Sequence, residues 1–386
     1  MATTSSSLFS GTISGVYLDH QATDRPRPQA IEAVKRCMEH YFGNASALAH
    51  ERGKLSRHHL EKFRRATASV VGASGESLVF TSGATEGNNL VIMSEGRRPG
   101  AHLVVSCIEH KCVLESAIRA KELGARVSVV PVDGRGVIDL DALRRTLAEG
   151  ATLISVMTAN NEIGTIQPFE EISRLCAATG ARFHTDAAQA VGKIRASVKA
   201  FGADYVSFTA HKYGGPQGIG AVVCSATVVD DMRPLLVGGG QERGMRPGTT
   251  PVQLCAGMAA ASLALVENID GEISRMRLLK RRLLDGLYSV GPFFTNGDAE
   301  RGLCNNLNGG FDRIPAALLM RRVPSVHFSV GSACTTGADA SHVLTAIGLK
   351  SQQIQSSFRL SMGWSTTEQD IDDAVAAFGA ALKTLR

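Results

Sequence analysis

The chain has 386 residues, of which 44% are apolar and 20% are charged, and its formal net charge is +5. This length exceeds one simple core and predicts about two domains, and the composition is typical of a soluble globular protein. No apolar stretch approaches the roughly 18 residues of a membrane helix, and no basic run predicts direct nucleic-acid binding.

The first residues, MATTSSSLFSGTISG, lack the basic and apolar regions of a secretory signal and are interpreted as a short polar leader. The cysteines are scattered singly, without a CxxC pair or a cluster with histidine, so neither a disulfide scaffold nor a metal site is expected. This pattern favours a reducing compartment, the cytoplasm. The eight cysteines are Cys37, Cys107, Cys112, Cys176, Cys224, Cys255, Cys304 and Cys334.

Short apolar runs alternate with amphipathic stretches in the first two thirds of the chain. Strands are expected at Ser77–Thr81, His102–Ser106, Arg126–Val130, Leu153–Thr158, Arg182–Thr185, Tyr205–Phe208 and Gly220–Cys224. Helices are expected between most of them, at Gly87–Glu95, Val113–Leu123, Leu140–Ala148 and Phe169–Gly180. Such alternation predicts an α/β fold with a mostly parallel seven-stranded sheet that is covered on both faces.

After about residue 256 the pattern changes, and a second, smaller α+β domain is expected. Its predicted elements are a long helix, two shorter strand regions and a closing helix, at Leu254–Val290, Gly302–Leu307, Val326–Val330 and Thr367–Leu385. The predicted division is a large domain over residues 15–260 and a small domain over residues 1–14 and 261–386.

Polar residues follow several of the expected strands, where open α/β sheets bind ligands. Lys212 follows one strand in SFTAHKYGG. Burial there would lower its pKa and give a nucleophilic amine, such as those that form Schiff bases with pyridoxal phosphate (PLP). Asp186, in FHTDAAQA, could keep a pyridine nitrogen protonated. The alternatives are a surface lysine at a turn and a helix N-cap aspartate.

Three further motifs carry possible chemistry. The strand–turn–helix LVFTSGATEGNNL offers free N–H groups and the Thr85 hydroxyl to a phosphate, unless it is an ordinary connection. His110, in CIEHKCV, could stack on a cofactor ring and move protons, or be structural. Cys334 has small polar neighbours in SVGSACTTG and could be an accessible nucleophile or an ordinary loop thiol. Together these motifs favour a PLP enzyme.

From Val16 onward the chain resembles the cysteine desulfurases of the class V aminotransferase group, which are fold type I PLP enzymes. The resemblance rests on YLDHQAT, TSGATEGNNL, EHKCVL, NNEIGTIQP, HTDAAQAVGK, SFTAHKYGGPQGIGA, GGGQERGMRPGTTP, GSACTTG and SSFRLSMG. It implies the fold type I architecture, a homodimer and a partner protein that accepts sulfur.

The resemblance also implies roles for single residues. The cofactor contacts would come from Ala84, Thr85, His110, Asn161, Asp186, Gln189, Thr209, His211, Lys212 and Thr249. Lys212 would bind PLP covalently, Asp186 would pair with the pyridinium nitrogen and Gln189 with the ring oxygen. His110 would stack on the ring, and Thr249 would reach the phosphate of the neighbouring subunit.

The phosphate would otherwise be bound by Ala84, Thr85, Thr209 and His211. Asn161 and Arg359 would bind the substrate carboxylate, and Cys334 would accept the sulfur.

The implied reaction converts L-cysteine to L-alanine and leaves a persulfide on Cys334, which supplies sulfur for iron–sulfur clusters, tRNA thiolation or DNA phosphorothioation. The alternatives are a selenocysteine lyase or another PLP enzyme of the same fold, such as an aminotransferase, and a non-catalytic scaffold.

The chain departs from the family pattern at Asp24-Arg25 and at Thr209, where serine is usual. Pro324 and His327 precede Cys334, and the stretch after it is one residue short. These features suggest the hypothesis that Cys334 lies on a more ordered segment that requires closure or a partner protein.

Overall fold

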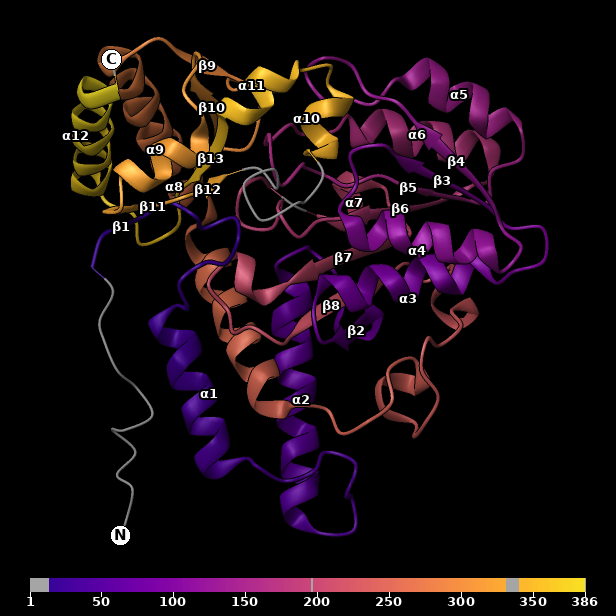
Figure 1. Cartoon of the computed structure of the whole chain (residues 1–386). Helices are drawn as coiled ribbons and strands as arrows, with labels where there is room; N and C mark the ends of the chain where they lie inside the picture. The colour runs from indigo at the N-terminus through magenta and orange to yellow at the C-terminus, as the bar shows by residue number, and fades with distance from the viewer. Residues whose placement is uncertain (1–13, 196, 331–339, 386) are drawn as a thin grey trace, which may run out of the picture.

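The computed structural model describes residues 14–195, 197–330 and 340–385. Its centre is a seven-stranded sheet in the order β2-β8-β7-β6-β5-β3-β4 (Figure 1). The strands are β2 (Leu78–Thr81), β3 (His102–Ser106), β4 (Arg126–Val130), β5 (Leu153–Ser155), β6 (Arg182–Asp186), β7 (Tyr205–Thr209) and β8 (Gly220–Cys224). Only β8 runs against its neighbours β2 and β7, and the other pairings are parallel. The predicted mostly parallel sheet is confirmed.

Helices cover both faces of this sheet (Figure 1). The side chains of a strand alternate between two cores: Leu103 and Val105 pack with α3 and α4, whereas Val104 packs with α5 and α6. This two-sided burial explains why the strands read as continuous apolar runs. The covering helices are α3 (Ala84–Gly96), α4 (Lys111–Glu122), α5 (Leu140–Ala148), α6 (Phe169–Thr179) and the short α7 (Val198–Phe201).

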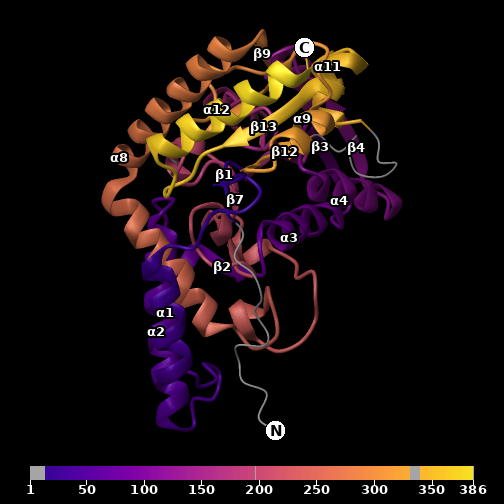
Figure 2. The ribbon, with the colours of Figure 1, turned by 60° about the vertical axis from the view of Figure 1, so that its left-hand side comes forward.

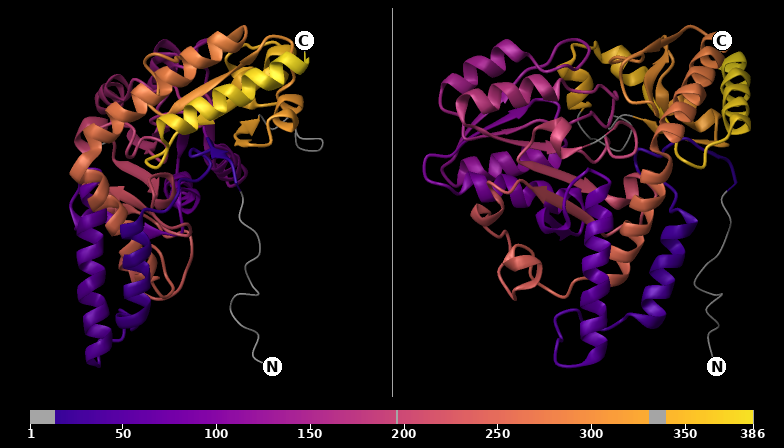
Figure 3. Two further views of the ribbon diagram at one scale, coloured as in Figure 1. Left: turned by 90° about the vertical axis from the view of Figure 1, so that its left-hand side faces the viewer. Right: turned by 180° about the vertical axis from the view of Figure 1, so that it is seen from behind.

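A 39-residue helix, α8 (Val252–Val290), runs along the molecule (Figures 2 and 3). Near its start it packs on α1 (Pro28–His40) and α2 (Glu51–Ser69), and near its end on α12 (Glu368–Leu385). A non-helical residue, Asn268, kinks it. Among the described residues α8 alone is long and apolar enough to cross a membrane. Half of its most apolar window is buried in the protein, as expected for a core helix.

The C-terminal part has its own core around a four-stranded antiparallel sheet, β12-β13-β10-β9, and a parallel pair, β1-β11. These strands are β1 (Val16–Tyr17), β9 (Phe293–Thr295), β10 (Asn306–Phe311), β11 (Val326–His327), β12 (Ser329–Val330) and β13 (Ser357–Ser361). The short helices are α9 (Ala316–Arg322), α10 (His342–Ala346) and α11 (Ser351–Ser356). Val16 and Leu18 also pack in this core. The domain division stays a prediction.

Two predicted strand regions differ in the structure. The strand expected at Gly302–Leu307 begins only at Asn306, because Gly302 and Leu303 donate their N–H groups to Asp298 and Gly164 in a turn. The region Val326–Val330 divides at Phe328. Its first half pairs with β1 and its second half pairs with β13, so one apolar run serves two sheets.

Candidate active site

A cavity of about 580 Å³ lies at the carboxyl ends of β6 and β7. The predicted site residues that line it are Ala84, Thr85, His110, Asn161, Asp186, Gln189, Thr209, His211, Lys212 and Arg359. Thr249 is exposed and does not line the cavity, and Cys334 lies outside the described residues. Residues far apart in the sequence therefore meet at one point of the fold.

Lys212 lies in the turn that directly follows β7. Its Nζ donates hydrogen bonds to the carbonyl oxygens of Gln21 at 2.5 Å and Ala22 at 2.8 Å. Burial, and then the positive charge of Arg359, lower the pKa of Lys212 to about 8. A substantial fraction of this amine is therefore neutral and nucleophilic near pH 7 to 8.

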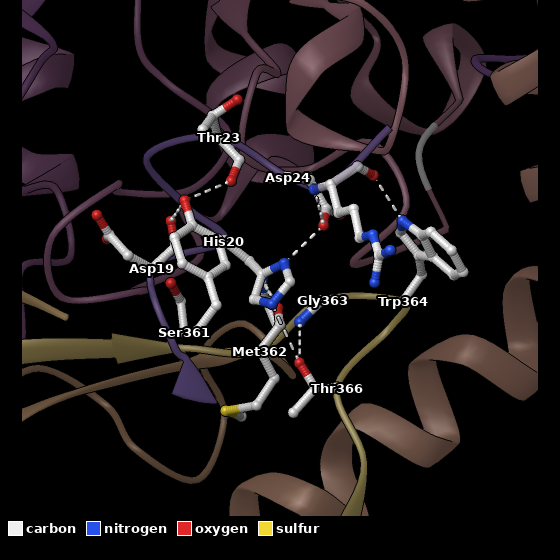
Figure 4. A network of polar contacts seen from close by, with 12 residues as sticks. Asp19, His20, Thr23, Asp24, Ser361, Met362, Gly363, Trp364 and Thr366 are labelled. Carbon is white, nitrogen blue, oxygen red and sulfur yellow. Dashed lines mark hydrogen bonds and ion pairs between the residues drawn. The ribbon is translucent and has the colours of Figure 1, made fainter. Parts of the chain in front are cut away.

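The carbonyl groups that hold Lys212 belong to a turn over residues 19–24, which Figure 4 shows from close by. The N–H group of Asp24 donates to the carbonyl of His211, next to Lys212. On the other side, His20 contacts the Asp24 carboxylate through Nδ1 and the Thr366 hydroxyl through Nε2 (Figure 4). The turn thus connects Lys212 to the segment that follows β13.

Asp186 ends β6 and is 6% exposed. Its Oδ1 accepts the N–H group of Ala188 at 2.9 Å, and its Oδ2 accepts Asn88 Nδ2 at 2.6 Å. No described lysine, arginine or histidine forms an ion pair with it. A nearly buried carboxylate without a cation is costly. Its position on the cavity wall therefore suits a ligand with a protonated ring nitrogen.

The cavity wall at the start of α3 suits a phosphate. Helix α3 begins at Ala84, and no side chain caps its N-terminus, so the first-turn N–H groups face the cavity side unpaired. A Cβ added at Gly83 would lie 3.7 Å from the Thr209 hydroxyl, so Thr209 lies beside the start of α3. Burial, and then the charge of Lys212, lower the pKa of His211 to about 4, so its ring is neutral at pH 7.

His110 is the N-cap of α4, and its ring lines the cavity. Nδ1 accepts the N–H group of Cys112 at 3.2 Å and lies 3.0 Å from the Cys112 sulfur. Cys112 therefore fixes the ring at its Nδ1 edge, while the rest of the ring is available to contact a planar ligand.

Arg359 lies on β13 and reaches the cavity from the C-terminal part. Its Nη1 donates to the carbonyl of Asn161, and its Nη2 donates to Asp19, both at 2.7 Å. The Nε atom is buried and has no partner among the described residues. A planar guanidinium fixed in this way suits a carboxylate ligand.

Two further residues of the cavity lining, Gln21 and Cys112, were not predicted from the sequence. Gln21 accepts Lys212 through its carbonyl and exchanges hydrogen bonds with the Gln189 side chain. Cys112 joins His110 to Asn88. Gln21 stood within the quoted segment YLDHQAT, but nothing local to that segment indicates that it folds across the cavity. The spacing of Cys112, two residues after His110 at a helix start, was the available signal.

Comparisons with known proteins identify the family of this chain. Residues 16–374 match the family described as Aminotransferase class-V. The chain is 38% identical to the mitochondrial cysteine desulfurase of Drosophila melanogaster over 92% of this chain and 78% of that protein. It is 35% identical to cysteine desulfurase IscS of Rickettsia prowazekii over 96% and 92% of the two chains.

Two solved structures are also similar. A NifS-like protein superposes with a TM-score of 0.89 at 33% identity, covering 96% of this chain and all of the other. SspA in complex with cysteine superposes with a TM-score of 0.79 at 30% identity, covering 90% and 98%. The family match and these relatives together place the chain in the class V aminotransferase family of fold type I PLP-dependent enzymes, within its cysteine desulfurase group.

Proposed function

We propose that the protein is a PLP-dependent cysteine desulfurase that converts L-cysteine to L-alanine and retains the sulfur as a persulfide on Cys334. The observation that carries the proposal is the shared cavity. It combines a lysine of lowered pKa, a buried carboxylate without a cation, an uncapped helix N-terminus and a fixed guanidinium. The relative SspA, which binds cysteine, supports the substrate.

The proposed cofactor contacts follow from the cavity walls. Lys212 attaches the cofactor through its amine, Asp186 pairs with the ring nitrogen, and His110 stacks on the ring. Gln189 contacts the ring oxygen. The phosphate lies at the start of α3 and is bound by Ala84, Thr85, Thr209 and His211. When bound, PLP withdraws electrons from the α-carbon of the amino acid that it carries.

The protein residues then orient cysteine and move its protons. Arg359 and Asn161 hold the substrate carboxylate, which fixes the α-carbon relative to Lys212. Once cysteine has displaced it, Lys212 takes the α-proton, a role that suits an amine with a pKa of about 8. Because burial favours the neutral amine, this base is available at neutral pH.

The sulfur step is assigned to Cys334, which lies outside the described residues and is proposed from its sequence context. Its thiolate attacks the substrate sulfur, and a sulfur–sulfur bond forms as the carbon–sulfur bond breaks. The electron pair of the broken bond stays on the three-carbon fragment, which takes up a proton at its β-carbon, regains the α-proton from Lys212 and leaves as L-alanine. The attack requires an approach of about 3–3.5 Å.

A homodimer is part of the proposal. Large apolar side chains are exposed just after α1 and on the segment before Thr249, including Phe42 at 64% and Val237 at 94%. Exposed apolar groups of this size are typical of protein–protein contacts. In such a dimer Thr249 reaches the phosphate of the neighbouring subunit. The test is the solution mass, which we expect to be twice 40.8 kDa and to halve in a Phe42→Glu, Val237→Glu variant.

The sulfur acceptor and the cellular location are also proposed. The persulfide passes to an acceptor protein that serves iron–sulfur cluster assembly, tRNA thiolation or DNA phosphorothioation. We propose the cytoplasm as the location, because the cysteines among the described residues are all free thiols, which fits a reducing compartment.

The decisive experiment measures alanine and sulfide produced from L-cysteine by the yellow purified protein. The wild type should produce both. Cys334→Ser should keep the cofactor colour but release no sulfide, whereas Cys107→Ser, a half-buried thiol away from the cavity, should behave as wild type. Lys212→Ala should abolish turnover.

Two results would overturn the proposal. Activity with selenocysteine but none with cysteine indicates a selenocysteine lyase. A purified protein that does not acquire PLP absorbance indicates a scaffold.

A further inference from the structure

Cys112 occupies an unusual position in the cavity wall, between the two groups proposed to contact the cofactor ring. Its sulfur lies 3.0 Å from His110 Nδ1 and 3.2 Å from Asn88 Nδ2. Asn88 is fully buried, and the same Nδ2 atom lies 2.6 Å from Asp186 Oδ2. The Cys112 sulfur and the Asn88 amide therefore link the stacking histidine to the Asp186 carboxylate.

The hydrogens in this chain of contacts can be assigned by counting donors. The Asn88 amide nitrogen has two hydrogens, and its two contacts are the Asp186 carboxylate and the Cys112 sulfur. The sulfur thus accepts from Asn88 and from the Thr85 hydroxyl, and its own hydrogen is directed to His110 Nδ1. Nδ1 also faces the backbone N–H group of Cys112. An Nδ1 atom that faces two donors cannot itself carry a hydrogen.

The ionisation of the thiol agrees with this assignment. Burial, and then the negative charge of Asp186, raise the pKa of Cys112 to about 12. The sulfur therefore keeps its hydrogen at neutral pH and acts as a weak donor rather than as a nucleophile.

We propose that Cys112 is a positioning residue that holds His110 as the tautomer protonated on Nε2 and couples it to the Asn88–Asp186 pair. Within residues 14–195, 197–330 and 340–385, no residue hydrogen-bonds Nε2 of His110, so this N–H group is directed to whatever occupies the cavity. The role of His110 in turnover rests on the proposed function, whereas its tautomer is a property of the protein alone.

The test is the ¹⁵N spectrum of histidine-labelled holoenzyme at neutral pH without substrate, with the His110 signals identified by their loss in His110→Gln. The wild type should show a protonated Nε2 and an unprotonated Nδ1. Cys112→Ala should give a mixture of tautomers. Cys112→Ser, which keeps a donor and an acceptor, should restore the wild-type pattern. Cys107→Ala is the matched control and should change nothing.

A second measurement, the affinity of each variant for PLP, reports on the coupling to Asp186. Cys112→Ala should weaken binding by about three- to tenfold, the effect of one lost hydrogen bond, and Cys112→Ser should recover most of it. The proposal is overturned if wild-type His110 carries its hydrogen on Nδ1, or if Cys112→Ala leaves both the spectrum and the affinity unchanged. Failure of the wild type to make alanine would refute the proposed function without affecting either readout.

Discussion

His20 Nδ1 lies 2.6 Å from Asp24 Oδ1, and both side chains are almost completely buried. This pair closes the turn whose carbonyl groups bind Lys212, and the same histidine contacts Thr366 beyond β13 (Figure 4). The pair therefore lies where the two parts of the protein meet at the active site.

Removal of one partner from this buried pair should be strongly destabilising. Asp24→Ala leaves the His20 ring without its principal partner, and we expect a loss of about 3 kcal/mol in unfolding free energy. Calorimetry should show a Tm several degrees below wild type. The control is Asp270→Ala, which removes an exposed ion pair with Arg195 and should cost less than about 1 kcal/mol. Equal Tm changes in both variants would contradict the prediction.

Gly363→Ala tests the same contact from the other side. A Cβ at this position would overlap the His20 ring and the Asp24 carboxylate, so one of them must move. We expect a lower Tm and, because the turn moves, slower attachment of PLP to Lys212. Gly348→Ala, where a Cβ meets nothing within 4 Å, provides a control for an added methyl group alone, although its positive φ adds some strain. Unchanged attachment kinetics in Gly363→Ala would show that the turn does not control the reaction of Lys212 with PLP.

The reactivity of Lys212 should depend on pH through its lowered pKa. Burial penalises the ammonium form, so the neutral amine accumulates from about pH 8 instead of near the usual 10.5. The rate at which apoprotein attaches PLP should rise with a midpoint near pH 8 and level off at higher pH. The measurement is stopped-flow absorbance, with borohydride reduction and peptide mass spectrometry to identify the lysine.

Arg359 contributes the second cause of this shift, and Arg359→Gln should therefore move the midpoint to higher pH. A wild-type midpoint near pH 10 would show that burial does not tune the amine.

Arg359→Lys should raise KM for cysteine by about tenfold or more with a smaller change in kcat, because an ammonium cannot bind a carboxylate in the planar two-point manner. Asp19→Asn keeps the arginine but weakens the contact that orients it, and we expect a smaller rise in KM. Steady-state kinetics on both variants check this. An unchanged KM in Arg359→Lys would assign the carboxylate to another residue.

Much of the fold and of the cavity could be predicted from the sequence because their signals are local. Strands buried on both faces read as apolar runs, and Asp186 and Lys212 stand where two such runs end. Parallel strands bring those ends to one edge of the sheet, so the cavity followed from the alternation of strands and helices.

Contacts between residues that are far apart in the sequence could not be predicted in this way. Asp24 was visible only as a departure from the family pattern, because its partners His20 and Thr366 are brought together by the turn and by the C-terminal part. Likewise, the turn at Gly302 is followed by a hydrogen bond from the Leu303 N–H group to the Gly164 carbonyl, which no local pattern encodes.

The long helix α8 is embedded in both hydrophobic cores, with Cys255 in one and Leu283 in the other. A continuous hydrogen-bonded rod resists bending, and the non-helical Asn268 is its weakest point. If the C-terminal core rocks against the large sheet, we expect α8 to bend at Asn268. Because Arg359 lies in the part of the protein after this kink and Lys212 in the part before it, such a bend would change the distance between the two side chains.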